Sequence, residues 1–194
     1  ARKEIEREAR SEAPQGVLAM AAPIPDVDLA YLIGDLASKK PKLLIAVDVV
    51  TDPGNLGAIL RSCDGAGVDG VILPRHRAVH ITPTAAKSAA GAAEYVPMCV
   101  VGGLPTALQQ MKDAGVWIVG LHDAADKSIF ELGSLGDESI CLVLGAEGPG
   151  LSRLVRERCD VLVNIPMLGA LSSLNVSVAA ALATYEVVRL RGLK

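Results

Sequence analysis

Residues 43–73 read LLIAVDVVTDPGNLGAILRSCDGAGVDGVIL, and they contain the unit that decides the fold class. An apolar, β-prone run at 43–47 is followed by helical spacing over 55–66 and by a second apolar run at 68–73. A strand, a helix and another strand in this order predict two parallel strands joined by a crossover helix. Because parallel strands need helices on both faces of their sheet, the unit predicts an α/β domain.

The alternation of strand and helix patterns continues to the C-terminal end. A helix capped by Asp28 is expected at 28–36, and a short strand at 16–22. Further apolar runs predict strands at 96–101, 116–121, 140–144 and 161–165. Helical spacing predicts helices at 83–93, 104–114, 153–158 and 175–189. The sequence therefore predicts an α/β fold in which a mostly parallel sheet has helices on both faces.

Length and composition limit the class of protein. With 194 residues, 51% of them hydrophobic and 21% charged, the chain fits one compact, soluble domain and is neither disordered nor fibrous. Its longest apolar runs are far shorter than the ~20 residues that a membrane-spanning helix needs. The charged opening, ARKEIEREAR, lacks the apolar core of a secretory signal. We therefore expect a cytoplasmic protein without a membrane segment.

Neither a metal site nor a general affinity for nucleic acid is expected. The four cysteines are widely spaced, form no CxxC pair and have no histidine ligand pattern beside them, which predicts reduced, buried thiols at Cys63, Cys99, Cys141 and Cys159. The net charge of −3 and the aromatic content of 3% argue against binding through a broad positive field or stacked aromatic side chains. Any RNA contact would have to come from local basic residues.

Residues 48–61, DVVTDPGNLGAILR, are the first segment with more than a generic pattern. Asp-Pro-Gly-Asn after a predicted strand is typical of a turn, and its glycine lets the backbone approach a ligand closely. Asn55 and Arg61 lie almost two turns apart on the predicted helix, so both can face one cleft. A helix cap followed by a solvated arginine would give the same pattern, and this segment alone leaves both interpretations open.

Residues 144–152, LGAEGPGLS, directly follow another predicted strand. Three glycines around Glu147 predict a loop whose backbone amides and carbonyls a ligand can reach, and the carboxylate offers a charge or an acceptor. A strand-to-helix turn with glycine at positive φ, followed by a helix from Leu151, explains the segment equally well.

Residues 165–177, IPMLGALSSLNVS, join a predicted strand to a long, alanine-rich helix. Ser173 is a candidate cap for that helix. Asn175 is expected on the first turn of a helix so apolar that most of its faces must be buried. Because a buried polar side chain needs a partner, a ligand at Asn175 is a plausible explanation.

Other motifs and residues do not fit their usual context. Residues 65–70, GAGVDG, match the dinucleotide pattern GxGxxG, but they end a helix and lead into a strand, the reverse of what phosphate binding requires. A GxxxxGK(S/T) phosphate-binding loop is absent from the sequence. His76, His80 and His122 follow neither a metal-site nor a catalytic-triad spacing.

Together and in this order, the three segments resemble the signatures of the SpoU (TrmH) family of RNA ribose methyltransferases, within the SPOUT class. The family signatures N-x-G-x-x-x-R, G-x-E-x-x-G and I-P-M-x-G-x-x-S-S-L-N-x-S correspond here to NLGAILR, GAEGPG and IPMLGALSSLNVS. Residues 82–98 also resemble the connecting region of the family, so the similarity extends from Gln15 to Arg191. Within the family, the chain most resembles bacterial enzymes that methylate a guanosine ribose in 23S ribosomal RNA.

The resemblance implies a fold, a cofactor and a partner. The C-terminal part of the parallel α/β domain would be threaded as a deep trefoil knot, an exception to the usual absence of knots. S-adenosylmethionine would bind bent between the knot loops, mostly through backbone groups, and two copies would dimerise through this domain, with both copies contributing to the cleft. The implied cofactor-binding residues are Leu144, Gly145, Gly148, Ile165, Met167 and Leu174.

The resemblance also implies catalytic residues, namely Asn55, Arg61, Glu147, Ser173 and Asn175. We interpret Arg61 first as an anchor for the target phosphate and a stabiliser of the developing alkoxide, and only second as a base, because a guanidinium normally stays protonated. The other four would position Arg61, the nucleotide and the cofactor. Candidate local contacts to RNA are Arg75, Arg77, Lys87, Arg153, Arg156 and Arg158.

Domain boundaries and alternatives follow from the same resemblance. We assign residues 15–194 to the catalytic domain and 1–14 to an N-terminal helix and linker, considered as the remnant of a preceding RNA-binding domain. Without that domain, these 194 residues are expected to bind cofactor but to methylate RNA poorly. The alternatives are a tRNA or antibiotic-resistance rRNA methyltransferase, a non-catalytic RNA-binding protein of the same fold, and an unrelated nucleotide-binding enzyme.

Overall fold

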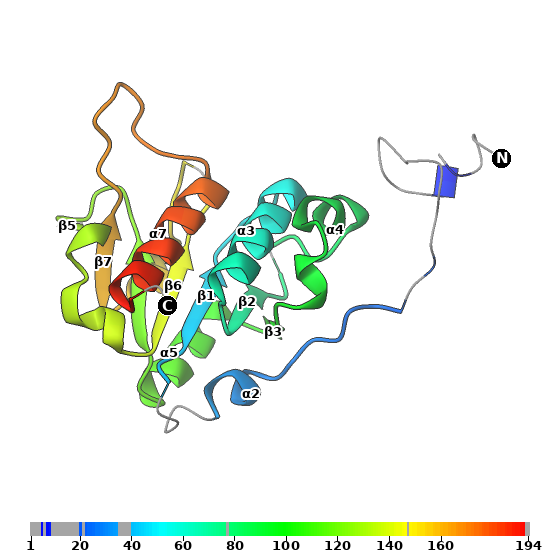
Figure 1. Cartoon of the computed structure of the whole chain (residues 1–194), viewed down its shortest axis with the longest axis horizontal. Coiled ribbons are helices and arrows are strands. Elements are labelled where there is room, and N and C mark those ends of the chain that lie inside the picture. The colour runs from blue at the N-terminus through cyan, green and yellow to red at the C-terminus, as the bar shows by residue number, and fades with distance from the viewer. Residues whose placement is uncertain are drawn as a thin grey trace.

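The computed structural model describes residues 5, 7–8, 20, 22–34, 40–76, 78–146 and 148–192. Within these residues the chain forms one seven-stranded sheet in the order β3-β2-β1-β6-β4-β7-β5, and every neighbouring pair of strands is parallel (Figure 1). The strands are β1 (Leu43–Val47), β2 (Gly70–Pro74), β3 (Met98–Val101), β4 (Trp117–Leu121), β5 (Lys127–Ser128), β6 (Ile140–Leu144) and β7 (Val161–Asn164). The predicted parallel α/β fold is confirmed.

Helices cover both faces of the sheet. The α-helices are α2 (Leu29–Ile33), α3 (Pro53–Ala66), α4 (Pro83–Ala89), α5 (Leu104–Asp113), α6 (Arg153–Arg156) and α7 (Val176–Leu190). The short 3-10 helices are η1 (Ala92–Glu94), η2 (Ile129–Glu131) and η3 (Gly133–Asp137). Buried side chains of α3, α4 and α7 belong to the core on one face, and those of α2, α5 and α6 belong to the core on the other.

The central strand β1 shows how the sequence produces these two cores. Leu43, Ile45 and Val47 pack into the core under α3 and α7, whereas Leu44 and Ala46 pack into the core under α5. Side chains of a strand point alternately to the two faces of its sheet. Since helices bury both faces, every position of β1 is apolar, and this explains the continuous run in the sequence.

The local structure differs from the sequence prediction at several places. The helix predicted at 83–93 ends at Ala89, because Ala90 (φ 51°) and Gly91 (φ 95°) adopt left-handed conformations before η1 begins. Residues 122–139, which received no assignment, contain β5, η2 and η3. Asp28 occupies the cap position of the short α2, but its side chain makes no capping hydrogen bond. The strand predicted at 16–22 lies mostly outside the described residues.

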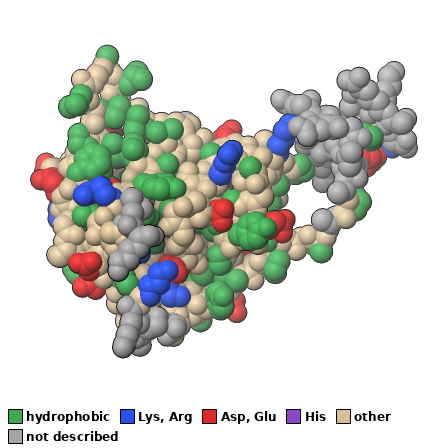
Figure 2. Space-filling model, in the orientation of Figure 1, with side chains coloured by type: hydrophobic (Ala, Val, Ile, Leu, Met, Phe, Trp, Pro, Cys, Tyr) green, Lys and Arg blue, Asp and Glu red, His purple; other side chains and the backbone are tan. Residues whose placement is uncertain are grey.

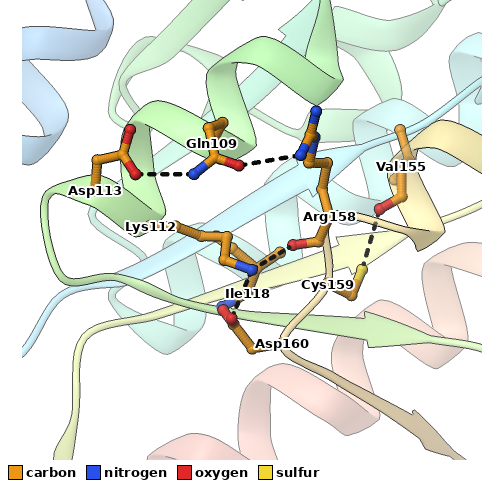
Figure 3. A network of polar contacts seen from close by, with 8 residues as sticks. All are labelled: Gln109, Lys112, Asp113, Ile118, Val155, Arg158, Cys159 and Asp160. Atoms are coloured by element: carbon orange, nitrogen blue, oxygen red, sulfur yellow. Dashed lines mark hydrogen bonds and ion pairs between the residues drawn. The ribbon is translucent and has the colours of Figure 1, made fainter.

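Side-chain carboxylates accept hydrogen bonds from backbone groups at the amino edge of the sheet, where the N-terminal ends of the strands lie. Asp69 Oδ2 accepts a hydrogen bond from Leu43 N, and Leu43 O accepts one from Asp69 N, both at 2.8 Å. Asp160 and Ile118 repeat this reciprocal pair at 2.8 Å, and Lys112 Nζ adds an ion pair of 2.7 Å to Asp160 Oδ1 (Figure 3). These contacts satisfy the first backbone groups of β1 and β4.

Arg191 fastens the C-terminal end of α7 to the same edge. Its guanidinium donates hydrogen bonds to the carbonyl oxygens of Lys42, Gly136 and Glu138 at 3.0, 2.8 and 2.8 Å. Hydrogen bonds from a charged donor are stronger than those between neutral groups. The last helix is therefore held at one end by the amino edge, and its other end lies at the carboxyl edge of the sheet.

The predicted burial of the cysteines is confirmed for three of the four. Cys63, Cys99 and Cys141 are buried, and Cys159 is half-buried. Burial raises the pKa of the Cys63 thiol to about 12, because a thiolate is poorly solvated there. Burial is also the main cause that raises the pKa of Cys159 to about 12, with a further contribution from Asp160. These thiols are packing groups and not nucleophiles.

Helix α4 packs closely against α3 at Gly57. A Cβ atom at this position would lie 2.5 Å from Ser88 Cβ and would also collide with the carbonyl oxygen of Ala85. Only glycine lets the two helix backbones approach this closely. The contact holds α4 beside the first turns of α3, where the turn of residues 52–55 lies.

We predict that Gly57→Ala lowers the free energy of unfolding by about 1–3 kcal/mol, the usual cost of overpacking, although alanine is the better helix former. Chemical denaturation monitored by circular dichroism measures this change. The matched control is Gly102→Ala, because a Cβ atom at Gly102 meets no atom within 4 Å. Equal stabilities of the two variants would contradict the close contact.

Candidate functional site

A pocket lies at the carboxyl ends of β4, β6 and β7, the edge opposite to the one closed by Asp69 and Asp160. Leu121, Leu144 and Val163, from the ends of these three strands, form its apolar base. Ligands of open α/β sheets bind outside the carboxyl ends of the strands. The location of this pocket is therefore that of a ligand site.

One wall of the pocket is the glycine-rich loop between β6 and α6. Ala146 and Gly150 exchange two backbone hydrogen bonds of 3.1 and 2.9 Å, which close the loop on itself. A Cβ atom at Gly145 would lie 2.5 Å from Leu151 N and would collide with the backbone of Gly150. Gly148 also lines the pocket, at a φ of 84°. Closure of the loop therefore depends on its glycines.

The opposite wall is the segment between β7 and α7. Ile165, Met167 and Leu174 line the pocket, while Leu168 is 99% and Leu171 is 76% exposed. The segment, orange in Figure 1, projects from the body of the domain, and hydrophobic side chains gather on it in the space-filling view (Figure 2). It thus has one side toward the pocket and an apolar side toward solvent.

The structure brings all six predicted cofactor-binding residues into this one pocket. Two loops that are separate in the sequence carry them, and they meet because β6 and β7 flank β4. The six are Leu144, Gly145, Gly148, Ile165, Met167 and Leu174. Their role in binding the cofactor remains a prediction.

Two of the predicted catalytic residues contact each other. Asn175 Nδ2 donates a hydrogen bond of 2.9 Å to Asn55 Oδ1, which joins the N-terminal ends of α7 and α3. Asn175 Oδ1 accepts a hydrogen bond of 2.9 Å from Ser177 N, so Asn175 is the N-cap of α7. This places the first motif directly beside the third.

The prediction that Ser173 caps the helix and that Asn175 is a buried residue on its first turn is wrong. The helix begins at Val176, one residue after Asn175, so Asn175 precedes the first turn and is exposed. Serine and asparagine are both good N-caps, and the sequence contains both. Ser173 instead lines the pocket.

The remaining predicted catalytic residues have different locations. Arg61 lies on α3 with Asn55, as predicted, but it is exposed and does not line the pocket of its own chain. Asn55 is half-buried and reaches the pocket wall through Asn175, whose neighbour Leu174 lines the pocket. Glu147 lies outside the described residues.

Asp48 is a structural link that the sequence prediction missed. Its side chain is buried, with 5% exposed, and Oδ2 accepts a hydrogen bond of 2.7 Å from Ser152 N, while its own backbone N donates one of 2.7 Å to Leu144 O. The first motif is thereby tied to both ends of the glycine-rich loop. The pattern in the sequence that could have indicated this link is an acidic residue at the end of an apolar strand.

Backbone strain follows directly after Asp48. Val49 has a φ of 58°, in the left-handed region that β-branched residues rarely adopt. Such conformations persist where the surroundings enforce them, and they are common at functional sites. Hydrogen bonds hold the chain on both sides of Val49. Those of Asp48 precede it, and Val50 O, which follows it, accepts a hydrogen bond of 2.9 Å from Val79 N.

The sequence prediction also missed two residues after β4. His122 and Asp123 both line the pocket, although His122 fits no metal or triad spacing. Both residues directly follow an apolar strand. This position could have indicated a place in the site, because the carboxyl ends of parallel strands lie at one edge of the sheet.

One of the predicted RNA contacts lies at the amino edge of the sheet. Arg75, Lys87, Arg153 and Arg156 are exposed. Arg158 is also exposed, and it donates a hydrogen bond of 3.2 Å to Gln109 Oε1 in the network around Asp160 (Figure 3). It therefore lies at the amino edge, away from the pocket. Arg77 lies outside the described residues. A role for Arg158 beside the pocket is therefore not supported.

Two kinds of feature are absent from the residues that the structure describes. None of their helices has both the length and the apolar character to cross a membrane. They contain no group of three or more histidine, cysteine and acidic side chains arranged to hold a metal ion.

Known proteins share both the sequence and the fold. Residues 42–185 match the SpoU rRNA Methylase family. The 23S rRNA (guanosine-2'-O-)-methyltransferase RlmB of Photobacterium profundum is 43% identical over 190 residues, which cover 98% of this chain and 77% of that protein. The RlmB protein of Yersinia pestis is 49% identical over 159 residues, which cover 82% of this chain and 64% of that protein.

Solved structures agree with these relatives. The SpoU methyltransferase AviRb from Streptomyces viridochromogenes, in complex with AdoMet, matches with a TM-score of 0.72 and 32% identity, covering 80% of this chain and 60% of that one. An AdoMet-bound rRNA methyltransferase from Sinorhizobium meliloti matches with a TM-score of 0.78 and 25% identity, covering 100% and 71%. With a family match over residues 42–185 and relatives at this level of identity, the chain belongs to the SpoU rRNA methylase family.

Proposed function

We propose that the chain transfers a methyl group from S-adenosylmethionine to a ribose 2′-hydroxyl in structured RNA, and that the target is a guanosine of 23S ribosomal RNA. The observation that carries this proposal is the meeting of the second and third motifs as the two walls of one pocket. Relatives that match almost the whole chain are named for this reaction, which supports the choice of nucleotide and RNA.

The pocket has the chemistry that this cofactor requires. Apolar side chains such as Leu121, Val163 and Ile165 suit the faces of an adenine ring, and loop backbone groups at Gly145 and Leu174 suit its polar edge. When bound, S-adenosylmethionine supplies an electrophilic methyl group on a sulfonium. The protein has to hold the acceptor hydroxyl in line with that group.

Arg61 anchors the phosphate of the target nucleotide and stabilises the negative charge that develops on the 2′-oxygen. A guanidinium stays protonated and offers a fork of donors that fits phosphate oxygens. The hydrogen-bonded pair of Asn55 and Asn175 fixes the N-terminal end of α3, and thereby the helix that carries Arg61. Ser173 and Glu147 position the nucleotide and the cofactor.

A second copy of the chain completes the cleft. Arg61 does not line the pocket of its own chain, so we place it in a cleft formed by both copies. Exposed apolar side chains on α7, namely Val178, Leu182 and Tyr185, offer a surface for the dimer. We further propose that residues 15–194 form the catalytic domain, that its C-terminal loops form the trefoil knot, and that the enzyme acts in the cytoplasm.

Ribose methylation in a strain that lacks the gene tests the reaction and its target. We predict that one guanosine of 23S ribosomal RNA loses its 2′-O-methyl group, and that the wild-type gene, but not an Arg61→Ala variant, restores it. Methylation mapping of total RNA measures both results. Loss of a methyl group from tRNA would move the activity to that substrate. An unchanged pattern in every RNA would contradict the proposed reaction.

Arg61→Lys separates an anchoring role from simple charge. Lysine keeps the positive charge but loses the planar fork, so we predict a fall in methylation rate of at least about tenfold, with unchanged affinity for S-adenosylmethionine. Single-turnover rates measured across pH, together with calorimetric titration of the cofactor, give both values. Arg158→Lys, at an exposed arginine that lies at the amino edge of the sheet, away from the pocket, is the control. Full activity of Arg61→Lys would exclude the bidentate anchor.

A further inference from the structure

The described lining of the pocket contains two titratable side chains, His122 and Asp123. Both follow β4, and neither belongs to the three motifs. Every other described residue of the lining has a neutral side chain. Asp123 is therefore the one formal negative charge of this part of the pocket.

Backbone contacts fix the position of this charge. Ala124 N donates hydrogen bonds to Asp123 Oδ1 at 2.9 Å and to His122 Nδ1 at 3.1 Å. His122 N donates to Val163 O at 2.9 Å, which ties the segment to β7. The residues that hold Asp123 thus belong to the end of the sheet itself.

The carboxylate of Asp123 is open to solvent beside its neighbour His122. His122 Nδ1 lies 3.4 Å from Asp123 Oδ1 and accepts the hydrogen bond from Ala124 N. The side chain of Asp123 is 66% exposed, whereas that of His122 is 16% exposed. A ligand entering the pocket can therefore meet the carboxylate at its mouth.

The proposed reaction changes the charge of the ligand in this pocket. S-adenosylmethionine carries a carboxylate, an ammonium and a sulfonium, which gives one net positive charge. Loss of the methyl group leaves S-adenosylhomocysteine, whose sulfur is a neutral thioether and whose net charge is zero. A fixed carboxylate attracts the first molecule more strongly than the second.

We propose that Asp123 is a specificity residue that favours S-adenosylmethionine over the demethylated product. This inference rests on the proposed methyl transfer and adds a role for the segment after β4. Because the charge of Asp123 strengthens the binding of S-adenosylmethionine but not that of the neutral product, it favours the replacement of product by fresh cofactor. The residue acts on the ligand directly, and His122 and Ala124 position it.

Calorimetric titration of both ligands tests the proposal. Asp123→Asn should weaken binding of S-adenosylmethionine about fivefold, the effect of one charge pair about 4 Å apart under water-like screening. Binding of S-adenosylhomocysteine should stay unchanged. The ratio of the dissociation constant of S-adenosylhomocysteine to that of S-adenosylmethionine therefore falls by the same factor. In the wild type this ratio should also fall when salt rises from about 0.01 M to about 1 M, and the variant should lack this dependence.

Matched variants make the result specific. Asp126→Asn removes an equal charge three residues further on, at an exposed side chain that does not line the pocket, and should leave the ratio unchanged. Asp123→Glu keeps the charge and should preserve most of the preference. A ratio that is unchanged in Asp123→Asn, or equally changed in Asp126→Asn, would overturn the inference and leave the proposed function intact. Failure of the wild type to bind S-adenosylmethionine would instead refute the proposed function.

Discussion

The pairing of β6 with both β1 and β4 is the constraint on which the site depends. β6 aligns Leu43 with Ile140 and Val47 with Leu144 on one side, and Trp117 with Ile140 on the other. Because all three strands are parallel, the loops that follow them emerge at one edge. The first motif, the glycine-rich loop and the segment with His122 and Asp123 become neighbours although they are far apart in the sequence.

The two edges of the sheet have opposite roles. At the amino edge, Asp69, Asp160 and Arg191 satisfy backbone groups, so this edge is closed by the protein itself. At the carboxyl edge, backbone groups are held by close loop geometry instead, as between Ala146 and Gly150. The buried carboxylate of Asp48 connects the loops there. A rigid sheet with one closed edge leaves its other edge available for a ligand.

Local patterns in the sequence were enough to predict the main strands of the sheet, because fully buried parallel strands are apolar at every position. They were also enough to predict most of the helices that cover it. They were not enough for residues 122–139, where two-residue and three-residue elements leave no periodicity. The cap of α7 could not be chosen, since both Ser173 and Asn175 are able to cap. Asp123 was missed because strand order, which places it beside the two loops, is a long-range property. The family resemblance supplied the six cofactor residues, and the fold explains why they meet.

The central claim is that the loops after β6 and β7 form the binding site for S-adenosylmethionine. A crystal structure of the chain grown with this cofactor tests it most directly. The account predicts the cofactor between the loop of Gly145 and the segment from Ile165 to Leu174, with its sulfonium toward Asp123. Cofactor bound elsewhere, for example beside residues 65–70, would contradict the claim.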